Sequence, residues 1–393
     1  MAGGPTTAAM AAAAVGAGGF GGIAGAYLTA PQLADTFREA LRLLGQAPGS
    51  ETRAPLVLNL FVPPRTPPPP PSESAMKAAL AYQARLEGEL RASVSTTLDL
   101  PEHGTAPEVR GAALSARSGA VAVAAAFESN VEAILELRPA AFSFVFGVPD
   151  DGILRAMRRA GIALVGTATS VEEAALLAEA GVDGIVAQGV EAGGHRGIFS
   201  VPTSAEEAAS QLYDDGDGHN SRTLGAQQLV ASIRRELGPS ADGRPTVVAA
   251  GGIARPDDVA RMREAGADAV QLGTALLLSQ ESGISAPYAA ALRAAQRGGR
   301  DDPGAPVFTR AFSGRWAKGL PNLVTRAAEN SEASPLLTFP MQNDLTSSMR
   351  KAATAAGTHE YISLWCGDAV AASAGWDGQT VDAIFSAMAA ELQ

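Results

Sequence analysis

Short apolar runs alternate along the chain with segments of helical periodicity. The runs are continuous rather than alternating, as in strands that are buried on both faces of a sheet. Most are followed by a helical segment, which predicts parallel strands joined by crossover helices. The predicted strands are Gly21–Ala24, Leu56–Phe61, Ala141–Phe146, Ile162–Val165, Gly184–Ala187, Thr246–Ala250 and Ala269–Leu272.

The helical segments carry start and stop signals. Thr6 or Thr7 can cap a helix over Ala8–Ala17. Glycine, which ends helices because it tolerates the left-handed conformation, directly follows three other segments. These are Asp151–Ala160, Val171–Ala180 and Pro256–Ala265.

An internal repeat identifies the architecture. "SVEEAALLAEAGVDGIV" (170–186) and "RPDDVARMREAGADAVQ" (255–271) superpose without a gap. Each has an acidic helix start, an A-G-x-D turn and a buried strand, the unit from which (β/α)8 barrels are built. The sequence therefore predicts an α/β fold, a TIM (β/α)8 barrel, with an open doubly wound sheet as the alternative.

The helix–strand rhythm stops near residue 275. We expect a barrel over 1–275, a smaller helical, loop-rich domain over 276–342, and C-terminal helices over 343–393 that pack back on the barrel. Seven strands are one too few for an eight-stranded barrel, and only Met1–Pro5 lie where the missing one belongs. The sequence predicts a first strand truncated at the N-terminus.

Composition excludes several functional classes. The 30 Lys and Arg against 41 Asp and Glu give a net charge of -11, which argues against a nucleic-acid partner. The single cysteine, Cys366, excludes an internal disulfide and a cysteine metal cluster, and fits a reducing cytoplasmic location. No apolar run approaches the ~20 residues of a membrane span. Asp214–Gly218 imitates a calcium loop but lacks its closing glutamate, so we expect a solvated loop and no metal.

Two glycine-containing turns predict a phosphate site. "VVAAGGIARPDD" (247–258) and "AVQLGTALL" (269–277) each lead from a strand into a helix. Backbone N–H groups approach an anion closely at such turns, and the last two βα loops form the usual phosphate site of a TIM barrel. Gly19–Ala24 matches a dinucleotide fingerprint, but no strand precedes it, which excludes a Rossmann site.

His195 follows a strand of the same predicted rim. In "VAQGVEAGGHRG" (186–197), four glycines surround this histidine within nine residues. Gln188, Gly193 and Gly194 precede it, so we expect backbone and side-chain amides to face a flat ring held by the phosphate site. The alternative is a structural histidine.

These motifs, with "LVLNLFVP", "FSFVFGVPD" and "SGRWAKGLPN", resemble the class I nitronate monooxygenases, formerly called 2-nitropropane dioxygenases. The resemblance implies an FMN-bound TIM barrel with a smaller second domain. It further implies oxidation of alkyl nitronates, propionate 3-nitronate especially, with O2 to a carbonyl compound and nitrite. The implied partners are the small-molecule nitronate and O2, without nucleic acid or membrane, and a monomer or a homodimer stays open.

The resemblance also implies roles for individual residues. Asn59 contacts the flavin ring, which Gln188 and Gly193 flank beside the catalytic His195, and Lys318 reaches the substrate pocket. The ribityl phosphate is held by Gly252, Gln271, Leu272, Gly273 and Thr274. The chain departs from the family at Trp365-Cys366-Gly367-Asp368, where the usual pattern is W-x-G-Q.

His195 would hold the nitro oxygens and, with neutral nitroalkanes, take the α-proton, a task suited to a pKa near neutrality. Two other functions stay open. One is a related FMN barrel acting as an NAD(P)H-dependent quinone or enoyl reductase. The other is a non-catalytic, truncated barrel.

Overall fold

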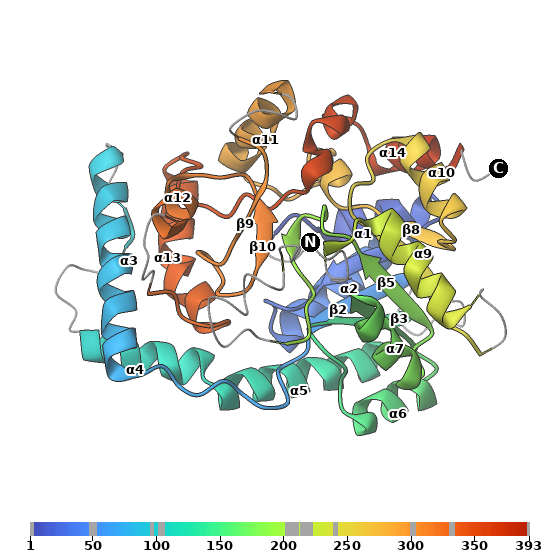
Figure 1. Ribbon diagram of the computed structural model, residues 1–393, viewed down its shortest axis with the longest axis horizontal. Coiled ribbons are helices and arrows are strands. Elements are labelled where there is room, and N and C mark those ends of the chain that lie inside the picture. The colour runs from blue at the N-terminus through green and yellow to red at the C-terminus, as the bar shows by residue number, and fades with distance from the viewer. Residues whose placement is uncertain are drawn as a thin grey trace.

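A parallel sheet of seven strands forms the centre of the structure, a computed structural model that describes residues 4–46, 53–94, 98–100, 107–200, 212, 223–238, 243–298, 304–329 and 335–390 (Figure 1). Its strands, in spatial order, are β1 Gly21–Ala24, β2 Leu56–Phe61, β3 Ala141–Val145, β4 Ala163–Ala168, β5 Gly184–Gln188, β7 Thr246–Ala250 and β8 Ala269–Gln271. All seven predicted strands are present, which confirms the α/β fold. The predicted truncated strand would precede residue 4, outside the described residues.

Helices cover the outer face of this curled sheet (Figure 1). They are α1 Ala8–Gly16, α2 Ala30–Leu43, α5 Ala120–Leu137, α6 Asp151–Arg159, α7 Val171–Glu179, α9 Ala226–Leu237, α10 Pro256–Glu264 and α14 Val381–Ala389. Leu56, Leu58 and Leu60 of β2 are buried in the large core cluster between sheet and helices. The alternate positions, which include Asn59 and Phe61, lie on the opposite face of the sheet.

The predicted helix signals are confirmed. The Thr7 side chain caps α1, accepting a hydrogen bond of 3.0 Å from the Met10 N–H. The three predicted stop glycines, Gly161, Gly181 and Gly266, have φ of 66°, 71° and 100°. A side chain is strained in that region, so glycine is the residue that these turns require.

The repeated A-G-x-D turn has one structural role in both copies. Asp183 precedes β5, and its carboxylate accepts from the Leu164 N–H of β4 at 2.7 Å. Asp268 precedes β8 and accepts from the Val247 N–H of β7 at the same distance. Each aspartate therefore satisfies a backbone donor at the start of the neighbouring strand.

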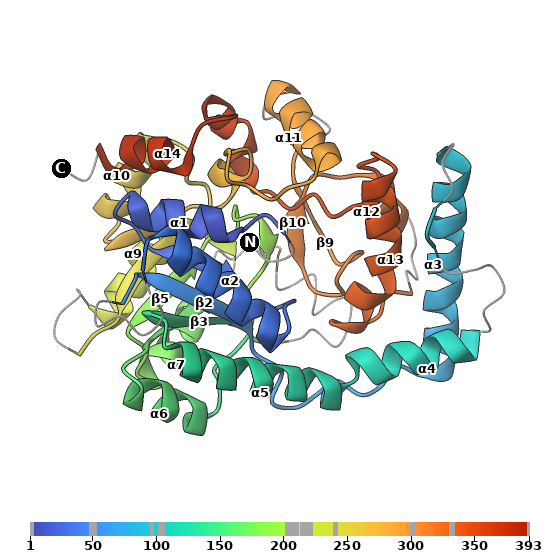
Figure 2. The ribbon, with the colours of Figure 1, turned by 180° about the vertical axis from the view of Figure 1, so that it is seen from behind.

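A second, smaller layer lies beside the barrel (Figures 1 and 2). It contains α3 Glu73–Ser93, α4 Pro107–Ser118, α11 Ala286–Gly298, α12 Leu323–Glu329 and α13 Met341–Ala355. Its antiparallel sheet has the order β6 Gly194–His195, β10 Ala317–Gly319 and β9 Val307–Thr309. The 3-10 helices η2 Thr274–Leu276, η3 Asp368–Val370 and η4 Ala372–Trp376 lie where the chain passes between the layers.

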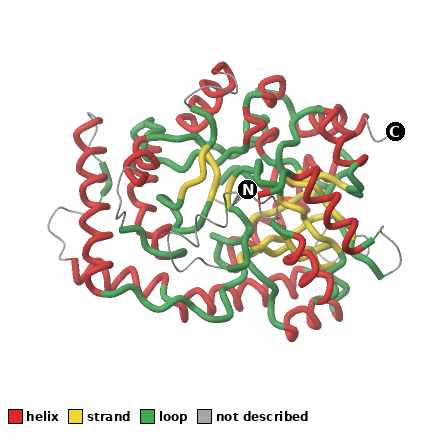
Figure 3. The backbone as a smooth tube through the Cα atoms, in the orientation of Figure 1, coloured by secondary structure: helices red, strands yellow, loops and turns green. Residues whose placement is uncertain are grey.

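Two separate parts of the chain build the second layer. Helix α3 follows β2, and Leu86 and Leu90 share a core cluster with residues of α11 and α13. Helices α4 and α5 connect this arm back to the sheet (Figure 3). Helix α14, at the other end of the chain, packs on α1 and α10. The division at residues 275 and 342 stays a prediction.

Within the described part of the chain, the helices fall short of the length and apolarity that crossing a bilayer demands.

Candidate functional site

His195 lies in the two-residue strand β6, opposite Ala317 of β10. Its Nε2 lies 2.9 Å from the hydroxyl of Ser313, and that hydroxyl donates to the Arg315 carbonyl at 3.1 Å. A serine hydroxyl has a single proton, so while Ser313 donates it to Arg315, Nε2 donates to Ser313 and Nδ1 is the proton-accepting nitrogen of the neutral His195 ring.

Four aromatic rings surround the His195 imidazole. The ring centroids of Phe61, Phe146, Phe339 and Trp365 lie 5.6, 6.0, 6.3 and 5.7 Å from its centroid. The Tyr27 ring packs edge-on against Phe61 at 5.6 Å. We call these five residues and His195 the aromatic cluster.

The surroundings of His195 disfavour its protonated form. Burial, followed by the charges of Arg315 and Arg350, lowers the pKa of His195 to about 3. The near-neutral pKa that we expected from the sequence is therefore absent in this structure. His195 is neutral at pH 7 and can act there as a proton acceptor.

This lowered pKa predicts a pH dependence of stability. Between its ordinary pKa of 6.5 and about 3, His195 takes up a proton in the unfolded chain but not in the folded protein. The unfolding free energy is therefore fully retained above pH 6.5 and falls with decreasing pH, by at most about 1.4 kcal/mol per pH unit. Urea unfolding of the wild type and of His195→Asn from pH 7 to pH 4.5 measures the difference. Equal pH dependence in both proteins would contradict it.

Phe146 combines backbone strain with a close cationic contact. It follows β3 directly and has φ of 78°, an outlier for a bulky residue. Its ring packs 4.7 Å from that of Phe61. The guanidinium carbon of Arg315 lies 3.9 Å from the ring centroid of Phe146. Strain of this kind is typical of functional sites, because surrounding contacts must hold it.

Gln188 and Asn59 both form side-chain hydrogen bonds. The Gln188 amide donates to the His195 carbonyl at 2.9 Å and accepts from the Gly197 N–H at 2.8 Å. It therefore fixes the backbone on both sides of Arg196. Asn59 pairs in register with Ser143 of β3, and its side-chain amide donates to the Ser143 hydroxyl at 2.9 Å.

The predicted phosphate-binding turns meet the segment Trp365-Cys366-Gly367-Asp368. Thr274 accepts a hydrogen bond from the Gly367 N–H at 2.9 Å. A Cβ on Gly193 would lie 2.3 Å from the Cys366 carbonyl carbon, so these two segments touch backbone to backbone. The structure thus brings Gly193 and Thr274, predicted from separate loops, to one place.

The other two glycines predicted to bind the cofactor, Gly252 and Gly273, differ in how much space surrounds them. Gly252 has φ of 70°, and a Cβ there would lie 2.8 Å from the Glu191 side chain. A Cβ on Gly273 would meet no heavy atom within 4 Å. Of its neighbours, Gln271 is exposed and Leu272 is half-buried. Among the three glycines predicted to bind the cofactor, Gly273, beside Thr274, is therefore the one with open space around it.

Lys318 is held by an ion pair. It lies on β10 opposite Gly194, and its Nζ lies 2.8 and 3.0 Å from the carboxylate oxygens of Asp368. The Nζ also lies 4.7 Å from the ring centroid of Phe308. Asp368 is the residue that departs from the family pattern, and here it ties Lys318 to the segment that covers Thr274.

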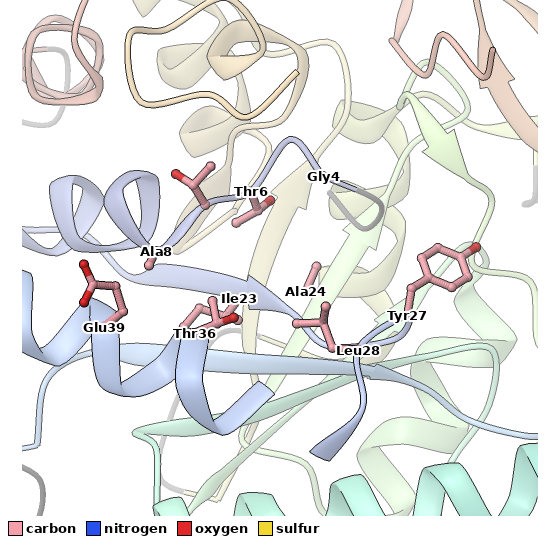
Figure 4. Close-up of a pocket in the computed structure, with 10 residues that line it drawn as sticks. Gly4, Thr6, Ala8, Ile23, Ala24, Tyr27, Leu28, Thr36 and Glu39 are labelled. Atoms are coloured by element: carbon pink, nitrogen blue, oxygen red, sulfur yellow. The ribbon is translucent and has the colours of Figure 1, made fainter. Parts of the chain in front are cut away.

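A cavity of about 550 Å³ opens beside β1 and α2 (Figure 4). Tyr27 lies at one end, so the cavity adjoins the aromatic cluster. Within the described residues, its walls share no member with the predicted cofactor-binding set. They are formed by Gly4, Thr6, Thr7, Ala8, Ile23, Ala24, Tyr27, Leu28, Thr36 and Glu39.

Sequence analysis missed most of the groups around His195. Phe61 was the easiest of them to predict, because it lies two positions after Asn59 and therefore on the same face of β2. Arg315 lies within the quoted SGRWAKGLPN segment. Phe339 and Arg350 had no recognisable signal, since their place in the site depends on how α13 packs.

Comparisons with known proteins identify the family of the chain. The nitronate monooxygenase family model matches residues 1–380. A nitronate monooxygenase from Pseudomonas aeruginosa is 39% identical over 238 residues, 61% of this chain and 60% of that protein. One from Paraburkholderia phytofirmans is 36% identical over 239 residues, 60% of this chain and 57% of that protein. The chain thus aligns with about three fifths of the length of these two relatives.

Two solved structures are similar over the whole chain. Nitroalkane oxidase from Streptomyces ansochromogenes has a TM-score of 0.72 and 32% identity, covering 100% of this chain and 93% of that one. FabK from Thermotoga maritima has a TM-score of 0.62 and 20% identity, covering 100% and 90%. The second likeness concerns the fold alone.

Proposed function

Because the chain belongs to the nitronate monooxygenase family, we propose that it oxidises alkyl nitronates, propionate 3-nitronate among them, with O2 to a carbonyl compound and nitrite. The observation that carries this proposal is the neutral His195 within an aromatic cluster that two guanidinium groups face. A nitronate is an anion with an electron-rich carbon. The positive charges of Arg315 and Arg350 favour its binding, and the rings exclude water from it.

The residues present fit a flavin mononucleotide. The open position at Gly273 and the Thr274 hydroxyl suit its phosphate, together with the Gly252 turn and Gln271–Leu272. Asn59, Gln188 and Gly193 suit its ring. The flavin supplies the redox chemistry, and the chain supplies position and charge.

His195 has two proposed tasks. It lies where it can hold the nitro group, and its Nδ1 can take the α-proton of a neutral nitroalkane. That second task creates an imidazolium near Arg315 and Arg350, which burial also disfavours. We therefore expect nitronates, which arrive without that proton, to be the better substrates. A direct contact of Lys318 with substrate would require its ion pair with Asp368 to open.

Nitrite release tests the proposed function. We expect purified, flavin-replete protein to release nitrite and consume O2 when propyl-1-nitronate is added. A flavin that NADH bleaches without O2, in a protein that yields no nitrite, would overturn the proposal in favour of a reductase. A protein that binds no flavin would overturn it in favour of a non-catalytic barrel.

The identity of the flavin is a separate prediction. The open space at Gly273, beside Thr274, suits a single phosphate, and FAD would need room for a second phosphate and an adenosine. We expect mass spectrometry of the heat-released cofactor to give FMN. Release of FAD would contradict this expectation.

A further inference from the structure

Arg350 directs its charge toward the aromatic cluster. It lies on α13, and its Nη2 donates to the Asn343 carbonyl at 2.7 Å and to the Asn343 side chain at 2.9 Å. The side chain therefore runs back along the helix toward its first turn, as long helical side chains do. Phe339, one residue before the Pro340 N-cap, packs against His195 and Phe61 at that end.

The positive charge of Arg350 lacks a close anionic partner in the described part of the chain. Its Nε is buried without a hydrogen-bond partner. Asp344 is the neighbouring carboxylate on α13, and its charge favours the protonated form of Arg350, but it accepts from the Ser118 hydroxyl and forms no ion pair with Arg350 among the described residues. Burying a guanidinium without a close counter-charge is costly, and Arg does not escape the cost by losing its proton. Arg350 therefore keeps part of its charge and hydrogen-bonding capacity for a further anionic partner.

The charge of Arg350 acts on the Tyr27 end of the aromatic cluster. Desolvation raises the pKa of the Tyr27 phenol, the charge of Arg350 opposes that shift, and the charge of Asp344 adds to it. Tyr27 lines the cavity of about 550 Å³ and packs on Phe61 (Figure 4). Arg315, in contrast, is fixed over Phe146 and to the Ile198 carbonyl. A molecule held at His195 can thus extend past Arg315 toward Arg350.

We propose that Arg350 is a specificity-determining residue that binds a carboxylate at the end of the substrate remote from its nitronate carbon. The inference rests on the proposed function and adds to it the residue that selects among nitronates. A guanidinium presents parallel N–H groups that match one carboxylate, and the Nε of Arg350 has no hydrogen-bond partner among the described residues. A single guanidinium also balances the single charge of a carboxylate.

Two nitronates with the same carbon number separate this role from a structural one. Propionate 3-nitronate carries a terminal carboxylate, and propyl-1-nitronate carries a methyl group in its place. In Arg350→Met we expect kcat/KM for propionate 3-nitronate to fall by about 10- to 100-fold, mainly through KM, as for lost hydrogen bonds to a charged group. For propyl-1-nitronate we expect a change of less than about 3-fold, because no contact with a carboxylate is lost.

Controls keep the test decisive. Lys351→Met removes an exposed positive charge from the next position of α13 and should leave both substrates unchanged. Arg350→Lys keeps the positive charge but not the parallel N–H groups of the guanidinium, so it should retain part of the preference for propionate 3-nitronate. If Arg350→Met does not fold, two other measurements replace it. One is the comparison of the two nitronates in Arg350→Lys, and the other is competitive inhibition of the wild type by malonate, which has two anionic ends.

The outcomes distinguish the two proposals. Wild-type protein that oxidises neither nitronate contradicts the proposed function. Wild-type protein that oxidises both, with an Arg350→Met variant in which both rates fall equally, overturns the role of Arg350 alone. A selective loss of the carboxylate-bearing substrate, with weaker inhibition by malonate, supports it.

Discussion

In His195→Asn, we expect kcat/KM for neutral nitroalkanes to fall by about 10²–10⁴-fold, the usual range for loss of a general base. The Nδ1 of the neutral imidazole is the proton acceptor that the bond to Ser313 leaves free, and asparagine has no basic nitrogen. Nitronates arrive without the α-proton. They should lose much less, only what the imidazole contributes to holding the nitro group.

The ratio of the two activities is the decisive measurement, because it does not depend on the fraction of active protein. Flavin content should stay near that of the wild type, since the proposed cofactor contacts lie on other residues. His359→Asn is a matched control, because His359 lies outside the cluster and pairs with Glu360. An unchanged nitroalkane-to-nitronate ratio in a flavin-replete variant would remove His195 from the role of base. A structural histidine would lower both activities together with stability.

The sequence predicted the barrel well because its signals are local. Strands such as β2 carry their apolar pattern within a few residues, and the A-G-x-D turns place Asp183 and Asp268 at one backbone donor each. The short strands β9 and β10 escaped prediction. Three residues are too few for any periodicity, and these strands form because β10 pairs with both β6 and β9 rather than through propensity.

The chemistry of the site depended on distant contacts and was predicted only in part. His195 was recognisable from the glycines around it. Its partner Ser313 lies 118 positions away, and Arg350 and Trp365 lie still further along the chain. Burial among such distant segments, followed by the charges of Arg315 and Arg350, lowers the pKa of His195 to about 3, which no local pattern reports. A sequence can thus single out a candidate catalytic histidine while leaving its protonation state open.

Gly193 and Gly273, both in the proposed flavin site, should differ in how alanine affects the stability of the protein. In Gly193→Ala, the new methyl group would meet the backbone of Cys366 and Gly367 at 2.3–2.7 Å. Backbone atoms cannot move aside as a flexible side chain can. We expect the unfolding free energy to fall by about 1–3 kcal/mol, with loss of the flavin, because the displaced segment carries the Gly367 N–H that bonds Thr274.

In Gly273→Ala, the added methyl group meets no protein atom within 4 Å, so this substitution should lower the unfolding free energy less than Gly193→Ala does. If the phosphate of FMN uses that space, however, the methyl group occupies it and flavin affinity should fall by at least about 10-fold, the loss of roughly one hydrogen bond to a charged group. Urea unfolding of the apoproteins and flavin titration of both variants separate the two effects. A Gly273→Ala protein that binds FMN as tightly as the wild type would place the phosphate elsewhere on the rim. A Gly193→Ala protein with wild-type stability would show that the segment over Thr274 can shift freely. In that case the contact between Gly193 and Cys366 would not be what holds the site together.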